Sequence, residues 1–331
     1  AFAGMTGERN EASMKFSENW LRELVDSPLD RDDLVQRLTL AGLQVEGVEP
    51  LGTALDGVIV AEILACEAHP DADRLRVCRV AVGKGEPLAI VCGAPNARSG
   101  LKAPLATPGT RMPGGMEIRK ATLRGVESNG MLCSAKELGL DADGSGLLEL
   151  PPAAPVGAPL AQVLGLPDAG IEIKLTPNRP DCLSITGLAR DVAALLGSAF
   201  HPAPITATAI VSRVERGVSV AAAADCPHYL GRVIEGIDAR VPTPFWLAER
   251  LRRSGVRPIS AIVDVTNYVM LELGQPLHAF DDSALTGGLV VRRGRSGEKL
   301  TLLDGSEAAL DEDFLVIADD AGPLALAGVM G

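Results

Sequence analysis

The sequence predicts a multidomain α+β protein in which a small β-barrel is inserted into a small α/β domain and an α+β domain follows. Two amphipathic helical stretches lie near the beginning, and residues 57–150 change to short alternating strands separated by Gly, Pro, Asn and Asp. The remainder mixes strands with helices. At 331 residues the chain is long enough for two or three domains, because single cores stop growing near about 250 residues.

The first domain is expected to combine residues 14–56 with residues 151–198. Ser17 can cap a short helix that buries Trp20, and Asp30 can cap a second helix that ends at Gly42. The segments 43–49 and 171–175 have the pattern of strands, and a helix is expected over 184–196. Residues 1–13 carry no periodic apolar pattern, so we expect a disordered extension or tag there.

The inserted domain is expected over residues 57–150. Its predicted strands are VIVAEILAC (58–66), LRVCRVAV (75–82), PLAIVCGA (87–94) and LKAPLA (101–106). Closing such a sheet removes its exposed edges, and the five-stranded oligonucleotide-binding (OB) barrel is a frequent solution of this size. The sequence therefore predicts an OB-fold barrel.

The last domain is expected over residues 205–331 as a partial α+β domain truncated at its C-terminal end. Strands are predicted near 207–223 and 228–237, and helices over about 244–254 and 259–273. Further strands and hairpins are predicted in LVVRRG, KLTLLDG and FLVIADDAGPLALAGVM. The chain stops within an apolar, strand-like stretch.

Composition and charge limit the function classes. The formal charge of −12 argues against a protein that coats nucleic acid indiscriminately, DNA included, and no apolar run is long enough to span a membrane. Without a secretory signal pattern, we expect a cytoplasmic protein. The cysteines lack C-x-x-C spacing, so we expect buried small side chains rather than a zinc site or disulfides.

A local reversal of charge lies between Leu88 and Val126. Six basic residues stand there against the single acid Glu117: Arg98, Lys102, Arg111, Arg119, Lys120 and Arg124. Basic side chains on a barrel surface are what a phosphate backbone requires, although a solvated face without a ligand is an equal alternative on charge alone. The barrel contains no Phe, Tyr or Trp, so RNA recognition there should depend on shape, phosphates and 2′-hydroxyls.

A metal site is a weaker alternative. His69, Asp71 and Asp73 have suitable ligand atoms and would be needed by a metal-dependent hydrolase. They flank Pro70 in a polar turn, where Asp side chains commonly bond nearby backbone amides. We expect no metal here.

Three ordered motifs favour RNA binding by the barrel: AEILACEAHPDADRLRVCRVAVG, IVCGAPNARSG and LRGVESNGMLCSAKELGL. They closely resemble the tRNA-binding barrel of several synthetases. Around them, MKFSENWLRELVD, IEIKLTPNRPDCLSITGLARDVAALLG and RPISAIVDVTNYVMLELGQPLHAFD resemble the β subunit of bacterial phenylalanyl-tRNA synthetase. The resemblance extends from Met14 to Gly331.

The resemblance implies a working enzyme of two α and two β subunits that uses ATP and Mg²⁺ to charge tRNA(Phe). The β subunit would bind tRNA and hydrolyse mischarged Tyr-tRNA. No cofactor is expected in the present chain itself. Editing has a chemical reason, because an apolar pocket rejects a near-isostere bearing one extra hydroxyl by only about 10², whereas a second site that hydrogen-bonds the hydroxyl discriminates by about 10⁴–10⁵.

The resemblance also implies which residues form the editing site. Thr266, Asn267 and His278 match its polar and catalytic positions, with His278 orienting the ester or the attacking water. Ala327, Gly328 and Gly331 match the amino-acid side of the pocket. From the residues alone, His278 is more typical of a structural histidine, and Asn267 of a capping residue. The acid expected to recognise the tyrosine hydroxyl would lie beyond Gly331, so we expect an incomplete pocket and no aminoacylation by this chain alone.

Two further expectations concern arginines. Arg250, Arg252, Arg253 and Arg257 either guide an acceptor end toward the editing pocket or form a solvated helix face. The TPNRPDC turn, with Arg179 and Asp181, is expected to fix a domain junction. The competing function is a non-catalytic tRNA-binding module, which would not require the TNYV and QPLHAFD segments.

Overall fold

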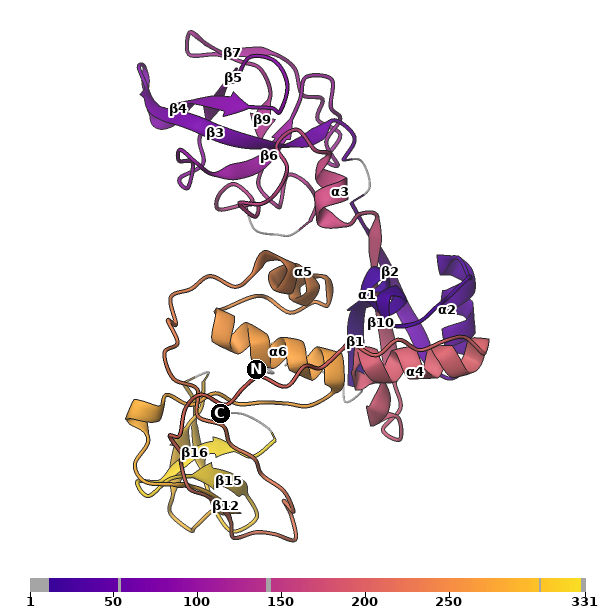
Figure 1. Ribbon diagram of the computed structural model, residues 1–331, viewed down its shortest axis with the longest axis vertical. Coiled ribbons are helices and arrows are strands. Elements are labelled where there is room, and N and C mark those ends of the chain that lie inside the picture. The colour runs from indigo at the N-terminus through magenta and orange to yellow at the C-terminus, as the bar shows by residue number, and fades with distance from the viewer. Residues whose placement is uncertain (1–11, 53–54, 141–143, 304, 329–331) are drawn as a thin grey trace.

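The computed structural model describes residues 12–52, 55–140, 144–303 and 305–328. The extension expected at 1–13 lies outside the described residues except for Ala12 and Ser13, for which it is wrong, because they pair with strand residues 175 and 174. It has mixed α+β architecture with several separate sheets (Figure 1). The inserted region lies at one end of the molecule, the C-terminal sheet lies at the other, and two helices lie between them. Within the described part of the chain, no helix is long and apolar enough to cross a membrane.

The first unit is built from both ends of the interrupted segment. Its elements are β1 (Ala12–Ser17), α1 (Glu18–Leu24), α2 (Arg31–Leu40), β2 (Gln44–Leu51), β10 (Asp168–Leu175), η1 (Pro180–Leu183) and α4 (Ile185–Leu196). Ser17 Oγ accepts from the Trp20 amide at 3.1 Å, and the Asp30 side chain caps α2, as predicted. Phe16, Trp20 and Leu21 form the centre of the core.

The sheet of this unit has the order β1-β10-β2 and is antiparallel throughout. The expected α/β class is therefore wrong for this unit, which is α+β. The central strand β10 comes last in the sequence, and Leu51 at the end of β2 is the cross-strand partner of Asp168. The chain thus leaves the sheet after β2 and returns at the neighbouring position.

The region between β2 and β10 is mainly antiparallel sheet. Its elements are β3 (Val58–His69), β4 (Ala72–Ala81), β5 (Leu88–Cys92), β6 (Lys102–Ala106), β7 (Ala121–Leu123), β8 (Val126–Ser128), β9 (Met131–Leu132) and α3 (Leu160–Leu164). The main sheet has the order β5-β4-β3-β6-β9. The four strands predicted by alternation are confirmed, but no pairing of described strands closes this sheet into a barrel.

The C-terminal region contains β11 (Val218–Val220), α5 (Phe245–Arg253), α6 (Ala261–Leu273), η2 (Asp282–Ala284) and five further strands. These strands are β12 (Leu289–Arg293), β13 (Lys299–Thr301), β14 (Glu307–Ala309), β15 (Leu315–Ala318) and β16 (Pro323–Leu326). A sheet of order β11-β12-β15-β16 and the hairpin β13-β14 organise it.

The two long strands predicted at 207–223 and 228–237 are wrong, because only the three residues of β11 are extended in a ladder there. Ile210 and Val211 are 85% and 94% exposed, respectively, so these apolar side chains are not buried against any described strand. The helices predicted near 244–254 and 259–273 are confirmed.

Four of the six cysteines are buried, as expected for small apolar side chains, and Cys66 and Cys226 are half-buried. All six are free thiols. Cys66 Sγ and Cys78 Sγ lie 3.5 Å apart on the paired strands β3 and β4. Burial raises the pKa of Cys133 to about 12, which makes this thiol unreactive near neutral pH.

Candidate functional site

A two-residue hairpin places Arg124 on the surface of the inserted region. Arg124 and Gly125 connect β7 to β8 with φ values of 46° and 83°, which are typical of a type I′ turn. Arg124 is the one non-glycine residue with positive φ among those described. Its guanidinium is exposed and makes no hydrogen bond or ion pair with any described residue.

His69 holds this hairpin against the turn between β3 and β4. Its Nε2 lies 3.1 Å from the Leu123 carbonyl oxygen, and its Nδ1 accepts a hydrogen bond from the Asp71 amide at 3.1 Å. The imidazole is buried. Both ring nitrogens of His69 are therefore engaged by backbone groups, so in this arrangement His69 has no free ring nitrogen for a metal ion.

The other predicted tRNA-binding residues divide into engaged and free side chains. Arg98 makes two 2.7 Å bonds to Glu149, which raise the pKa of Arg98 and lower the pKa of Glu149. Lys102 Nζ donates to the carbonyl oxygens of Pro152 and Ala154 at 2.5 and 2.7 Å. Arg98 thus bonds within the inserted region, and Lys102 holds that region to the segment that follows residue 150.

Arg119 pairs with Glu117 at 2.8 Å, although both side chains remain largely exposed. Lys120 and Arg111 are exposed, and neither side chain has a hydrogen-bonding or ion-pair partner among the described residues. The structure thus leaves Arg111, Lys120 and Arg124 as the cations most available to a phosphate backbone.

The predicted editing residues lie on three different segments. Thr266 and Asn267 are on α6, His278 is on the extended segment after it, and Ala327 and Gly328 lie in the turn after β16. Gly331 lies outside the described residues. Among the described residues, no hydrogen bond or ring contact joins these three groups.

The environments of the polar members differ. The Thr266 hydroxyl donates to the Val263 carbonyl oxygen at 2.7 Å, within its own helix. Asn267 is 3% exposed and shares the buried face of α6 with Asp264 and Leu271. Asp264 is held there by Thr243 Oγ1 and the Ile259 amide, so this face is tied to the start of α5 and to the loop before α6.

His278 packs against Phe280, with ring centroids 4.3 Å apart. Although the His278 side chain is solvent-exposed, partial desolvation by the surrounding chain lowers its pKa below the usual range. The imidazole is therefore mainly neutral near pH 7 and can accept a proton from water.

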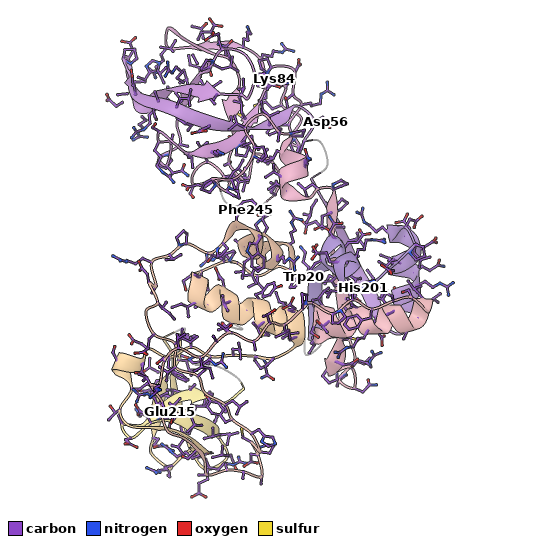
Figure 2. The ribbon with its side chains drawn as sticks, viewed as in Figure 1. Trp20, Asp56, Lys84, His201, Glu215 and Phe245 are labelled. Atoms are coloured by element: carbon purple, nitrogen blue, oxygen red, sulfur yellow. The ribbon has the colours of Figure 1, made fainter. Side chains whose placement is uncertain are left out.

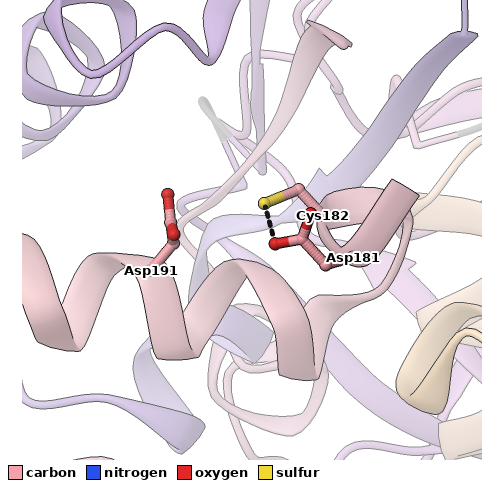
Figure 3. Close-up of side chains that lie close together, drawn as sticks. All are labelled: Asp181, Cys182 and Asp191. Carbon is pink, nitrogen blue, oxygen red and sulfur yellow. Dashed lines mark hydrogen bonds between the residues drawn. The ribbon is translucent and has the colours of Figure 1, made fainter. Parts of the chain in front are cut away.

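A cluster of acids and a thiol lies at the start of α4 (Figure 3). Asp181, Cys182 and Asp191 have ligand atoms close enough to surround an ion. The Arg179 guanidinium already lies among them, at 2.9 Å from Asp181, 2.9 Å from Cys182 and 2.8 Å from Asp191. Arg179 thus occupies the space between these ligand atoms and offsets one of the two carboxylate charges, and its bond to Asp191 fixes the TPNRPDC turn against α4.

Sequence reasoning missed a buried junction around Asp168. Its carboxylate accepts hydrogen bonds from Ser17 Oγ at 2.6 Å, from the Asn19 and Ala169 amides at 3.0 and 2.7 Å, and from Arg253 Nη1 at 3.0 Å. These donors come from β1, α1, β10 and α5. The residues are far apart in sequence and have ordinary local patterns, so no sequence signal indicated this contact.

The four arginines predicted to guide an acceptor end lie on α5 or just after it, and most of them form ion pairs. Arg250 pairs with Glu23, Arg252 with Glu249, and Arg253 with Asp168. Arg257 is exposed. The prediction that this group guides an RNA end as free cations therefore has little support, except at Arg257.

Comparison with known proteins decides the family. Residues 58–159 match the family described as "Putative tRNA binding domain", and residues 225–331 match the B3/4 domain. The phenylalanine–tRNA ligase β subunit of Xanthomonas campestris pv. campestris is 60% identical over 96% of this chain. The corresponding subunits of Pseudomonas putida and Methylococcus capsulatus are 57% and 56% identical over the same share.

The chain belongs to the phenylalanine–tRNA ligase β subunit family. It spans 40% of the length of these relatives. Among solved structures, the C-terminal domain of Plasmodium vivax p43 is similar over 30% of this chain and 56% of its own, with 24% identity and a TM-score of 0.23. A MetRS-related protein from Pyrococcus horikoshii is similar over 30% of this chain and 85% of its own, with 25% identity and a TM-score of 0.23.

Proposed function

We propose that this β-subunit chain binds tRNA(Phe) and contributes to the hydrolysis of mischarged Tyr-tRNA, in support of aminoacylation by a complex of two α and two β subunits. The observation that carries the proposal is the order of two recognised domains, a tRNA-binding domain at 58–159 and a B3/4 domain at 225–331, in one phenylalanine–tRNA ligase β chain. The proposed domains are the first unit over 14–56 with 151–198, the inserted tRNA-binding domain over 57–150, and the editing domain over 205–331. The proposed location is the cytoplasm.

The inserted region is proposed to be an OB-type barrel. The support comes from the edges of its sheet, because the Asn129 amide donates to the Ala89 carbonyl oxygen at 2.9 Å and the Val91 amide donates to Ser128 Oγ at 3.1 Å. These bonds connect the edge strand β5 to the segment that leads into β9, at the opposite edge. A closed or nearly closed sheet would follow from them.

The RNA contact is proposed to use the free cations of this region. Arg111, Lys120 and Arg124 are exposed, and each phosphate that they neutralise would release counterions. Arg98, Lys102 and Arg119 have protein partners and would have to exchange them for RNA. Because the chain as a whole carries a charge of −12, binding should be weak and strongly dependent on salt.

The proposed editing chemistry is attack of water on the ester that joins tyrosine to tRNA. The ester C–O bond breaks, the water oxygen forms the carboxylate, and the tRNA hydroxyl takes a proton. A neutral His278 can orient the water and accept its proton, while Thr266 and Asn267 offer polar groups to the ester. Ala327, Gly328 and Gly331 are proposed for the amino-acid side.

ATP and Mg²⁺ are proposed for the complete enzyme rather than for this chain. The Arg179 guanidinium already lies among the ligand atoms of the acid and thiol cluster, and a thiol is not a ligand that Mg²⁺ prefers, so this cluster of described residues does not fit a Mg²⁺ ion. No step of the proposed editing reaction uses either group.

The test of editing is release of tyrosine from Tyr-tRNA(Phe) by this chain and by a β subunit of the full length of its relatives. We expect hydrolysis by the longer protein and a large loss in its His278→Ala variant, while Phe-tRNA remains intact. If the longer protein is inactive, or if His278→Ala hydrolyses Tyr-tRNA as fast as the parent, the editing assignment fails.

A second candidate is a tRNA-binding module without catalysis. The separation of Thr266, Asn267, His278 and the 327–328 turn onto three segments without a mutual contact favours it. Retained tRNA binding with no deacylation in either protein would select this alternative.

A further inference from the structure

A cleft of about 600 Å³ lies where α1, α3 and α5 converge. Figure 2 labels Trp20 of α1 and Phe245 of α5, which both line it. The other lining residues used below are Arg22 and Glu23 of α1 and Trp246, Glu249, Arg250 and Arg253 of α5. Its volume falls within the range of about 300–1,000 Å³ that is usual for ligand sites.

Two residues that line this cleft carry buried donors without acceptors. Trp20 is 2% exposed and the Arg253 side chain is 10% exposed, and neither Trp20 Nε1 nor Arg253 Nε has a hydrogen-bond partner among the described residues. An unpaired buried donor is costly, by about 1–3 kcal/mol, so a ligand with acceptor oxygens would be stabilised here.

The cleft also contains an exposed aromatic surface. Trp246 is 54% exposed and meets Tyr268 edge-on, while Tyr268 stacks on Trp20 with ring centroids 5.3 Å apart. The Arg250 guanidinium lies 4.9 Å from the Trp20 ring and 5.8 Å from the Trp246 ring. Arginine and aromatic groups thus lie side by side, and Trp246 retains exposed ring surface on which a base could stack.

The charges in the cleft balance one another, and its unpaired donors favour an oxygen-rich ligand. Its two carboxylates are already paired, since Glu23 accepts from Arg250 and Glu249 accepts from Arg252 and Arg253. The three arginines of the lining are paired as well, Arg22 with Glu18, Arg250 with Glu23 and Arg253 with Asp168, so the cleft carries no excess of free positive charge. The combination of stacking surface, arginine and free donors is the one that binds unpaired nucleotides.

We propose that this cleft takes one unpaired nucleotide of a bound RNA, with its base stacked on Trp246 and its oxygens accepting hydrogen bonds from Trp20 and Arg253. The proposal rests on the tRNA-binding function proposed above and adds to it a stacking platform, because residues 57–150 contain no Phe, Tyr or Trp. Helix α3 begins directly after the matched tRNA-binding segment, so the cleft adjoins it.

The test uses the two tryptophans as reporters, because both line the cleft and the chain has no others. The chain is titrated with an unstructured oligouridylate of about twelve nucleotides, a length within the usual site size, and fluorescence is followed. We expect saturable quenching, about a five- to 150-fold weaker affinity for Trp246→Ala, and near-parental affinity for Trp246→Phe, since one base–aromatic stack is lost only in the first. Thermal unfolding checks that both variants fold.

Three results would overturn the proposal. One is binding of the oligonucleotide without quenching and with equal affinity for the parent and Trp246→Ala. If Lys120→Ala then binds tRNA more weakly than the parent does, the proposed tRNA-binding function still stands. Another is a fluorescence response to an acidic aromatic peptide but not to RNA, which would assign the cleft to a protein partner. The third is the absence of binding to both the oligonucleotide and tRNA(Phe), which would remove the proposed function as well.

Discussion

Single side chains separate the basic residues of the inserted region into two kinds. Lys120 is exposed and unpaired among the described residues, whereas Lys102 donates to two carbonyl oxygens. We expect Lys120→Ala to weaken tRNA binding and to reduce the salt slope by about 0.7–0.9, the value for one phosphate contact. Arg124→Ala should behave in the same way.

The measurement is a set of tRNA titrations at several salt concentrations, with Lys102→Ala as the matched control. Lys102→Ala should lower the unfolding midpoint and leave the slope of the salt dependence unchanged. Identical slopes for the parent, Lys120→Ala and Arg124→Ala would show that these cations do not touch phosphate.

Asp181 gives the stability of the chain a pH dependence. Its hydrogen bonds to Arg179 lower the pKa of the carboxyl from 3.8 to about 2. A depressed folded-state pKa contributes stability that is fully present above about pH 4 and is lost as the pH falls toward 2. We expect the gap in unfolding free energy between the parent and Asp181→Asn to shrink over this window.

Chemical denaturation from neutral pH down to about pH 2 measures that gap. The pair Arg179→Ala and Arg179→Ala/Asp181→Asn is the control, because the depressed pKa needs the guanidinium. A gap that stays constant through the window would contradict the assignment.

At the scale of elements, the start of α4 is packed against the TPNRPDC turn without room for a side chain. A Cβ on Gly187 would lie 1.8 Å from the Asp181 carbonyl oxygen, and Ser184 Oγ caps the helix through the Gly187 amide at 3.1 Å. Gly187→Ala must therefore move backbone, and we expect a loss of about 1–3 kcal/mol or more despite the better helix propensity of alanine.

Urea unfolding compares Gly187→Ala with Gly47→Ala. Gly47 lies in β2 with no atom within 4 Å of its potential Cβ and without a positive φ, so that substitution should change stability little. Equal stability of the two variants would show that the TPNRPDC turn can shift to accommodate a Cβ at little cost in free energy.

The same scale shows what the sequence could predict. The helices beginning after Ser17, Asp30 and Ser184 follow local rules, because a cap and an apolar face lie within one or two turns. The strands expected at 207–223 and 228–237 needed a distant partner, and most of those residues pair with nothing among the described chain. Alternation predicts that a strand can form but does not identify its neighbour.

The candidate site shows the same division. Charge counting found Lys120 and Arg124, but it could not show that Arg98 and Lys102 bond to residues about fifty positions away. The cleft that Trp20 and Trp246 line is formed by helices more than two hundred residues apart in the sequence, so no local pattern could predict it. Family resemblance indicated the editing residues, and their assembly into one site remains a prediction.

For the whole molecule, the Asp168 junction connects the first unit, the end of the inserted region and α5. Removing the carboxylate leaves Arg253 buried without that charge partner. We expect Asp168→Ala to lower the unfolding free energy by about 3–5 kcal/mol, as is usual when one partner of a buried ion pair is removed. Urea denaturation measures the loss.

Asp238→Ala is the control, since Asp238 forms an exposed pair with Arg240 and its removal should change stability little. If the Asp168 and Asp238 variants unfold alike, the junction contributes no more than a surface pair.

The central position of β10 in the sheet also sets the order in which the parts of the chain can fold during synthesis. Strands β1 and β2 do not pair with each other, because β10 lies between them in the sheet. Strand β10 is synthesised only after all the residues between Leu51 and Asp168. Until β10 is available, the backbone groups of β1 and β2 lack their hydrogen-bonding partners in the sheet. The apolar face of α1 likewise has no complete sheet to pack against. The nascent first unit must therefore wait, with its edges open, while the inserted region folds ahead of it.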